Sequence, residues 1–314
     1  MGAGGVEIEF RVASGAFASN IMWGRQQTGS VLCRSCGGLT GVSDETCFHC
    51  GARNPGLFGF AAGLRNFGAD LGFGPLILSL CVIAYGASLF LDPAGIGFQG
   101  LMNLLSPSLE AGQRMGSSGI YPVWKYGRWW TVLSAGWLHG SLLHIFFNMY
   151  WVRILVPQVA ELYGPGRTVI IYTLASVLGF AMSSTAPVLI LMGAPFLGGM
   201  LRVFPGYGYF TLGASASLMG MWGALVHYGR RTGSSNLRSW AWTNVLYFMV
   251  FGLVMRGIDH WAHLGGFLGG WLFAWLLDPL KSERTNHLVM AVLCLVASVA
   301  AIVASLLIPV PAFE

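Results

Sequence analysis

Charged side chains are scarce in this chain of 314 residues, which has 17 Lys and Arg and 12 Asp and Glu, together 9% of the sequence. A soluble domain carries roughly 25%. This shortage, with 55% apolar residues, excludes a disordered chain, a coiled coil and an ordinary soluble globular domain. The net charge of +5 comes from residues spread along the chain and gives no case for nucleic-acid binding. The first thirty residues lack the basic start and apolar core of a secretory signal peptide.

Long apolar stretches are abundant instead, each near the roughly 20 residues that cross the hydrocarbon of a bilayer. The 45 Gly and 12 Trp agree with a polytopic membrane protein, because Gly is frequent in membrane helices and Trp at their interfaces. The pattern predicts an all-α membrane fold with seven spans, near 75–91, 140–160, 168–192, 213–229, 237–255, 261–277 and 287–308. The 92–139 connection is rich in Trp and Tyr and is expected to lie in the outer interface rather than to span.

Basic residues set the expected orientation of these spans. The segment before the first span and the loops after spans two, four and six hold Arg25, Arg34, Arg53, Arg65, Arg167, Arg230, Arg231, Arg238, Lys281 and Arg284. The opposite loops hold fewer: Arg114, Lys125, Arg128, Arg202 and Arg256. Because Lys and Arg accumulate on the cytoplasmic side, we expect the N-terminus in the cytoplasm and the C-terminus outside.

Four of the six cysteines crowd into eighteen residues near the N-terminus, as Cys33-Arg-Ser-Cys36-Gly-Gly and Cys47-Phe-His-Cys50-Gly. Two such turns supply the four tetrahedral thiolates that Zn²⁺ prefers, and a cytoplasmic location argues against disulfides. Redox-active dithiols and free surface thiols are the alternatives. The sequence therefore predicts a structural four-cysteine zinc ribbon that needs its metal to fold, with a docking role more plausible than a catalytic one. The lone cysteines of apolar runs, Cys81 and Cys294, are expected to be small core residues.

Polar residues inside membrane spans are costly, so each is a candidate for function. His144 and Asn148, at the start of the second span, are four residues apart and share a helix face, with His139 just before them. Both can donate hydrogen bonds to one point, or simply join neighbouring helices.

The fourth span opens with Gly213-Ala-Ser215-Ala-Ser217-Leu-Met-Gly220. A serine among small residues is usually packing material. Its position at the N-terminal end of the span favours a nucleophile, because free backbone N–H groups and the helix dipole stabilise a developing oxyanion there.

The sixth span opens with Asp259-His260-Trp-Ala-His263-Leu-Gly-Gly266-Phe-Leu-Gly-Gly270. Gly266 and Gly270 form a small-residue face, and His263 lies one turn before Gly266 on that face. If this face packs on the fourth span, His263 meets Ser215, the minimum for activated acyl transfer. A structural histidine is the alternative.

Other intramembrane chemistries fit less well. Zinc metalloproteases need His-Glu-x-x-His, which the sequence lacks, and paired-aspartate proteases need two carboxylates inside spans, whereas Asp92, Asp259 and Asp278 flank them. A transporter with a histidine proton relay needs a polar path across the membrane, but the histidines cluster at one face.

Taken in order, three fragments resemble the rhomboid family of intramembrane serine proteases over roughly residues 73–277. They are W-L-H-G-S-L-L-H-I-F-F-N-M (137–149), followed by Glu161 and Gly164; G-A-S-A-S-L-M-G (213–220); and G-I-D-H-W-A-H-L-G-G-F-L-G-G (257–270). The residues themselves predict a flexible tail (1–30), a zinc ribbon (31–53) and a Gly-rich linker (54–72). The resemblance implies that a rhomboid core of six transmembrane helices (73–280) and one extra C-terminal transmembrane helix (281–314) follow them. It also leads us to expect a multi-pass protein of the bacterial inner membrane.

The resemblance implies roles for individual residues. Ser215 would be the nucleophile and His263 the general base, with no acid orienting the imidazole. His144, Asn148 and the backbone N–H of Ser215 would donate to the oxyanion, and Gly213, His139, Gly266 and Gly270 would support the site. No cofactor is required for catalysis. The substrates would be single-span or polytopic membrane proteins, cut in or beside a transmembrane segment that unwinds easily, at small residues such as Ala or Gly.

Several positions depart from the family pattern. The residue after the serine is Ala216 rather than Gly, which would tighten the pocket, and an aromatic position one turn further on is Met219. The arginine of the outer-loop pattern W-W-R is Thr131, with Arg128 nearby as a substitute. The 193–212 connection is longer than usual.

A catalytically weak or inactive rhomboid-like protein that binds or routes membrane clients is the rival hypothesis. Inactive relatives usually lose the serine or the histidine, and both are present here. The zinc ribbon is a candidate for recruiting a cytoplasmic partner.

Overall fold

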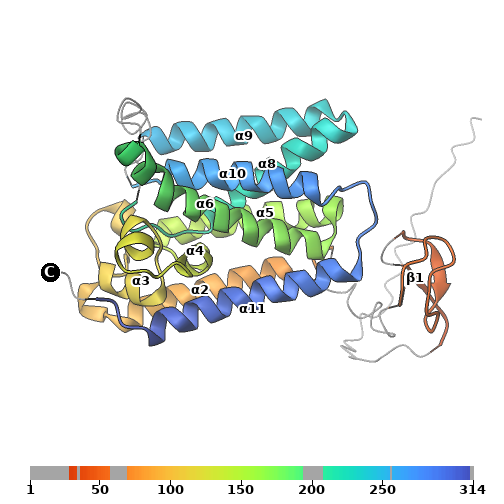
Figure 1. The fold of residues 1–314 in the computed structure, drawn as a ribbon, viewed down its shortest axis with the longest axis horizontal. Coiled ribbons are helices and arrows are strands. Elements are labelled where there is room, and N and C mark those ends of the chain that lie inside the picture. Colours follow the sequence, from red (N-terminus) through yellow and green to blue (C-terminus); the bar gives the residue numbers. More distant parts are fainter. Residues whose placement is uncertain (1–27, 34–35, 57–68, 194–207, 255–256, 312–314) are drawn as a thin grey trace, which may run out of the picture.

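The computed structural model describes residues 28–33, 36–56, 69–193, 208–254 and 257–311, and it consists of a helical bundle and a small β-ribbon (Figure 1). The long helices are α2 (Phe73–Leu91), α5 (Leu142–Tyr163), α6 (Pro165–Gly193), α8 (Ser215–Thr232), α9 (Ser235–Val254), α10 (His260–Leu276) and α11 (Thr285–Leu307). The ribbon is an antiparallel pair, β1 (Ser30–Leu32) and β2 (Leu39–Gly41), with Val31 opposite Thr40. The predicted fold class, a helical polytopic membrane protein preceded by a small module that holds Cys33, Cys36, Cys47 and Cys50, agrees with this arrangement.

The seven long helices of the described part coincide with the seven predicted spans to within a few residues at each end. Four of them, α2, α5, α6 and α11, are long and apolar enough to cross a membrane by length and composition alone. Of the other three, α8 carries His227, Arg230 and Arg231 near its end, α9 begins with polar residues around Arg238, and α10 has only 17 residues. The lower hydropathy of α8 has a physical reason, since 13 of its 18 residues are buried by other helices rather than facing lipid.

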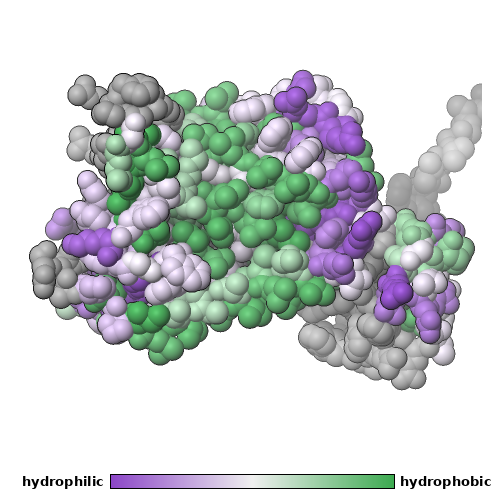
Figure 2. Space-filling model, viewed as in Figure 1, coloured by the Kyte–Doolittle hydropathy of each residue, from purple (hydrophilic) through white to green (hydrophobic). Residues whose placement is uncertain are grey.

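Figure 2 shows a broad apolar surface across the middle of the bundle, with hydrophilic residues gathered at the end where α8 leads into α9 and α10 into α11. Exposed apolar side chains are frequent on α9 and α11, among them Leu246, Val250, Leu293 and Val296. Such exposure is what a lipid-facing helix requires and what a soluble protein avoids.

Helix α8 lies at the centre of the bundle and packs against α5, α6, α9 and α10. Helix α10 lies between α6 and α8, which it contacts more closely than any other element. These contacts depend on small residues: a Cβ at Gly270 would overlap the carbonyl of Gly220 on α8, and a Cβ at Gly265 would meet the backbone of Leu178 on α6. Close helix approach of this kind is typical of membrane bundles.

The 92–139 connection forms short helices, none long enough to span. They are η2 (Pro93–Gly95), η3 (Leu101–Asn103), α3 (Leu109–Met115), η4 (Tyr121–Lys125), α4 (Thr131–Ser134) and η5 (Ala135–Trp137). Ser118 pairs with Thr211 through two backbone hydrogen bonds, of 2.9 Å and 2.7 Å. The connection is therefore attached directly to the segment that leads into α8.

Some predictions fall on residues outside the described ranges. They are most of the tail (1–30), most of the linker (54–72) and most of the long 193–212 connection. The boundaries proposed between the five parts of the chain stay predictions.

Candidate active site and cysteine cluster

Ser215 is the first residue of α8 and is placed there by the unusual backbone of Gly213. Gly213 has φ +135°, which residues with side chains rarely adopt, and it turns the chain sharply into the helix. Between Gly213 and His227 every residue is buried except Ser215, which is partly exposed. No side chain in the described part caps the N-terminus of α8, so the N–H groups of its first turn stay available to an acceptor beside Ser215.

The structure brings Ser215 and His263 together, 48 residues apart in sequence. The Ser215 Oγ lies 2.9 Å from the His263 Nε2, within hydrogen-bonding distance. His263 is buried, with 5% of its surface exposed. Its other ring nitrogen, Nδ1, has no hydrogen-bond partner within the described ranges. The pair is thus a dyad in geometry, without a third group orienting the imidazole.

Asp259, the nearest carboxylate in sequence, is engaged elsewhere. It is the N-cap of α10, where its Oδ1 accepts from the backbone N–H of Ala262 at 2.9 Å, and its Oδ2 accepts from the Ser183 hydroxyl on α6. These bonds fix the start of α10, one turn before His263. Asp259 therefore helps to place the helix that carries the imidazole.

His144 lies near Ser215 across Gly213, and its ring orientation is set by the backbone. The Gly140 N–H donates to the His144 Nδ1 at 3.3 Å, so a neutral ring carries its proton on Nε2. Ser141 caps α5 by accepting from the His144 N–H. A Cβ at Gly213 would lie 2.7 Å from the His144 Nε2 and 3.6 Å from the Ser215 Oγ. The absence of a side chain at Gly213 leaves the space between the two groups open.

Asn148 and His139 complete the polar residues near this space. The Asn148 Nδ2 donates to the His144 carbonyl at 2.8 Å, which leaves its second N–H for another acceptor. His139 is 2% exposed, with its ring edge-on to that of His144 at 5.2 Å between centroids. It also lines a cavity of about 140 Å³. His139 thus packs against the ring of His144.

Two of the departures from the family pattern have a structural explanation. Ala216 is fully buried and packs with Ala135, Phe180 and Ala262, facing Gly179 of α6. Its methyl group is accommodated there instead of narrowing the space beside Ser215. Thr131 is also fully buried, and its hydroxyl donates to the Arg128 carbonyl at 2.8 Å.

Two residues that shape the site, Gly140 and Gly179, were not predicted from the sequence. Gly140 supplies the N–H that orients His144, and Gly179 makes room for Ala216. The pattern Ser141-x-x-His144 is an N-cap signature that points to the helix start near Gly140. No local signal in α6 marks Gly179, because its role depends on a residue 37 positions away.

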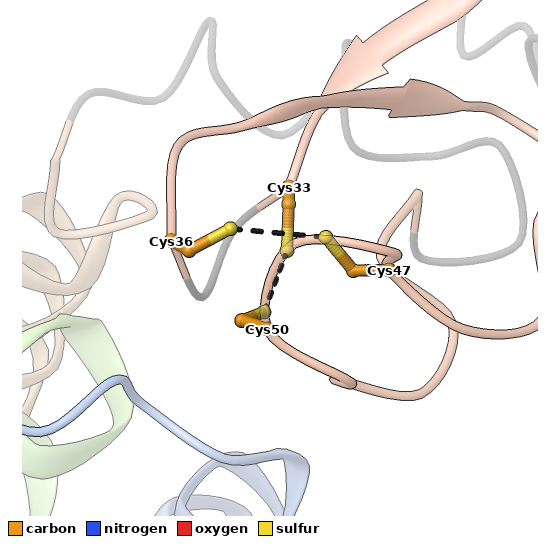
Figure 3. Close-up of side chains that lie close together, drawn as sticks. All are labelled: Cys33, Cys36, Cys47 and Cys50. Atoms are coloured by element: carbon orange, nitrogen blue, oxygen red, sulfur yellow. Dashed lines mark hydrogen bonds between the residues drawn. The ribbon is translucent and has the colours of Figure 1, made fainter.

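The four clustered cysteines converge in the β-ribbon module (Figure 3). Their sulfurs all lie within 4.8 Å of one another, with Cys33 and Cys50 at 3.8 Å and Cys36 and Cys47 at 3.7 Å. A zinc ion about 2.3 Å from four sulfurs at tetrahedral corners places them roughly 3.8 Å apart. These separations fit zinc and are too long for disulfides, and none of the four cysteines forms a disulfide.

The two halves of the module repeat one turn. The Cys33 carbonyl accepts from Gly37 at 2.7 Å and the Cys47 carbonyl accepts from Gly51 at 2.8 Å. Both glycines have positive φ, of +71° and +69°. Desolvation raises the pKa of the Cys47 thiol, but hydrogen bonds from the backbone N–H groups of Cys50 and His49 and from the Cys33 and Cys36 thiols outweigh it and lower this pKa to about 7. The pKa of the Cys50 thiol shifts the other way, because its hydrogen bond to the Ala52 backbone lowers it but desolvation and the three neighbouring thiols outweigh that bond and raise it to about 12. The donor set suits a metal that binds thiolates.

The fold and this geometry together define a polytopic helical membrane protein with a serine–histidine pair at the start of two parallel helices. Residues 126–279, close to half of the chain, match the family model of the Rhomboid domain, so this part of the chain is a rhomboid domain.

Three curated relatives show the extent of the similarity. The chain is 30% identical over 168 residues to RHOMBOID-like protein 4 of Arabidopsis thaliana, covering 52% of this chain and 38% of the relative. It is 27% identical over 146 residues to Rhomboid protease GluP of Bacillus subtilis (strain 168), covering 45% and 25%. It is 24% identical over 176 residues to Inactive RHOMBOID-like protein 8 of Arabidopsis thaliana, covering 52% and 43%. The chain therefore spans less than half the length of each of these relatives.

Proposed function

We propose that this protein is an intramembrane serine endopeptidase that hydrolyses peptide bonds in or near transmembrane segments of membrane proteins. The observation that carries the proposal is the 2.9 Å approach of the Ser215 Oγ to the His263 Nε2 within a rhomboid domain. Ser215 is the nucleophile and His263 the general base. The family also includes relatives named as proteases, such as GluP.

In the first half of the reaction, His263 Nε2 accepts the proton of the Ser215 hydroxyl as Oγ attacks the scissile carbonyl carbon. The tetrahedral intermediate carries its negative charge on the former carbonyl oxygen. Collapse of this intermediate breaks the peptide bond, and His263 returns the proton to the departing amine. The products of this half are a free amine fragment and an acyl-enzyme ester on Ser215.

In the second half, water attacks the ester while His263 takes one of its protons, and Ser215 leaves with that proton as the acid fragment is released. The oxyanion is stabilised by the N-terminus of α8, through the Ser215 backbone N–H and the helix dipole. The His144 Nε2–H and the unused N–H of Asn148 are the side-chain donors. The Gly140 hydrogen bond supports this role for His144, because it leaves the proton on the nitrogen beside Gly213.

The rival function is a rhomboid-like protein that binds membrane clients without cutting them, and one relative carries the name inactive. The specific observation against it is that both members of the pair are present and hydrogen-bonded, with His263 buried and Ser215 partly exposed. A protein that only binds has no need of this pairing.

Covalent labelling tests the proposal directly. A fluorophosphonate reacts with an activated serine by forming an O–P bond and expelling fluoride. We expect detergent-purified protein to cleave a model single-span substrate, to acquire one phosphonyl group on Ser215, and to lose cleavage in proportion to labelling, as measured by intact-mass and peptide mass spectrometry. Labelling spread over several serines, or cleavage that survives complete labelling of Ser215, would contradict the proposal.

The cysteine module is proposed to be a structural zinc ribbon in the cytoplasm that recruits a partner. Four sulfurs at tetrahedral separations support the metal, and the many basic residues before the first span support the orientation. Deletion of residues 1–55 tests the docking role, because unchanged cleavage together with unchanged partners in cells would contradict it. The rhomboid domain supports a location in a membrane.

Removal of the metal is expected to unfold the ribbon and leave the peptidase active. With so few apolar residues to bury, the module depends on metal coordination for its folding free energy. We expect one zinc per chain by inductively coupled plasma mass spectrometry in the wild type and none in Cys36→Ser/Cys47→Ser. Cleavage of the model substrate in detergent should stay within twofold. A matched Cys81→Ser variant should retain its zinc, and loss of cleavage on zinc removal would make the module part of the catalytic machinery.

A further inference from the structure

Arg128 is a buried charge with an unusual set of partners. Only 2% of its surface is exposed, and no carboxylate of the described residues forms an ion pair with it. Its Nη1 donates to the Gln113 carbonyl at 2.8 Å, and its Nη2 donates to the Ser305 carbonyl at 2.7 Å. A guanidinium stays charged when buried, so these two carbonyls have to compensate its loss of water.

Both carbonyls belong to the last turns of helices. Gln113 is in α3 and Ser305 is in α11, 177 positions from Arg128. Helix C-termini carry partial negative charge and unpaired carbonyls, which suits a forked cation. The Trp130 Nε1 adds a hydrogen bond to the Ser305 Oγ at 3.0 Å. Two side chains of the 92–139 connection, Arg128 and Trp130, therefore hydrogen-bond to the end of α11, the additional C-terminal helix.

The same connection holds the segment before the nucleophile. Ser118, three residues past the end of α3, pairs with Thr211 through two backbone hydrogen bonds, and the Thr131 hydroxyl joins Arg128 to the Ser118 hydroxyl, at 2.8 Å and 3.3 Å. Thr211 is four residues before Ser215.

A second link runs through η5. Ala135 is the first residue of η5, and its carbonyl accepts a hydrogen bond from the Gly213 N–H at 2.9 Å. Gly213 is the residue whose positive φ places Ser215 at the start of α8. Continuous hydrogen bonds therefore join the end of α11 to the turn that carries the nucleophile.

We propose that Arg128 is a positioning residue and that the C-terminal turn of α11 forms part of the support of the catalytic turn, residues 211–215. The inference rests on the proposed peptidase function. It assigns to the additional helix a role in catalysis, exerted on the geometry of Ser215 and its oxyanion donors rather than by contact with substrate.

The test compares two perturbations with two matched controls. Arg128→Lys keeps the charge but lacks the planar fork that reaches two carbonyls, and deletion of residues 304–314 removes Ser305. Arg114→Lys changes an exposed arginine of α3, and deletion of residues 309–314 shortens the chain but keeps α11 whole. For each protein we would measure kcat and KM on the model substrate and amide hydrogen exchange in peptides covering residues 208–218.

We expect Arg128→Lys and the 304–314 deletion to lower kcat about tenfold, with KM within twofold, because orientation of the nucleophile is lost while substrate binding remains. Exchange over 208–218 should rise about tenfold in both and stay unchanged in both controls. Wild-type kcat with wild-type exchange in these variants would overturn the inference, as would exchange that rises equally throughout the bundle.

Amide exchange separates this inference from the proposed function, because it does not depend on hydrolysis. A wild-type protein without Ser215-dependent cleavage would refute the peptidase, whereas the exchange data would still decide whether α11 supports residues 211–215. If Arg128→Lys does not fold, the two deletions make the same comparison.

Discussion

Ser215→Ala and His263→Ala are each expected to reduce kcat/KM for a model transmembrane substrate by about 10⁴-fold or more, equivalent to about 5 kcal/mol of transition-state stabilisation. The reason is that the two side chains act as one unit. Without the hydroxyl no acyl-enzyme forms, and without the imidazole nothing accepts the proton that the hydroxyl must lose. Quantification of both cleavage fragments over long incubations measures the residual rate.

The double variant is expected to be no slower than either single one, because groups that act as a unit have strongly non-additive effects. Ser217→Ala and His260→Gln are the matched controls, each within three residues of its counterpart on the same helix and each buried. Both controls should keep cleavage within a few fold. Cleavage by Ser215→Ala at more than about one hundredth of the wild-type rate would show that another residue is the nucleophile.

Gly270→Ala is expected to destabilise the protein by about 3 kcal/mol or more and to abolish most activity. A Cβ at this position would overlap the carbonyl group of Gly220, and backbone atoms cannot move aside as a flexible side chain can. Helices α8 and α10 would have to separate. Since Ser215 is on one and His263 on the other, their 2.9 Å approach would also be lost. Thermal unfolding in detergent, followed by circular dichroism, measures the change in unfolding temperature.

Gly86→Ala is the control for this prediction. Gly86 is also inside a long helix, α2, but nothing lies within 4 Å of the Cβ that alanine would add. We therefore expect an unchanged or slightly raised unfolding temperature, since alanine is better than glycine in a helix by roughly 0.5–1 kcal/mol. If Gly270→Ala unfolded at the wild-type temperature, the close packing of α8 on α10 would not be a source of stability.

Much of this architecture could be predicted from local patterns. Apolar runs of spanning length gave the positions of the helices, because a bilayer imposes the same length on every span. The paired turns Cys33-x-x-Cys36 and Cys47-x-x-Cys50 predicted a four-sulfur cluster, and the structure brings those sulfurs within 4.8 Å. The spacing of Gly266 and Gly270 predicted a packing face, and that face does contact α8.

Other features were not accessible in this way. That Ala216 faces Gly179 on α6, and not the space beside Ser215, depends on the rotation of α8 about its axis, which no local pattern in the sequence specifies. The partner of Asp259 was equally hidden, since Ser183 is 76 residues away on another helix. The role of Arg128 could not be read from the outer-loop pattern, because both of its acceptors are backbone carbonyls, which every residue possesses.

The sequence by itself determined the class of protein, the approximate position of each helix and the residue types available for chemistry. These follow from composition and from short-range periodicity, which reflect the solvent and the helix repeat. Only the tertiary structure decided which polar groups meet. It brings Ser215 to His263, gives His144 its hydrogen bond from Gly140, and joins α11 to the 92–139 connection through Arg128. Such pairings depend on helix rotation and depth, which are fixed by the packing of small residues between elements far apart in the chain.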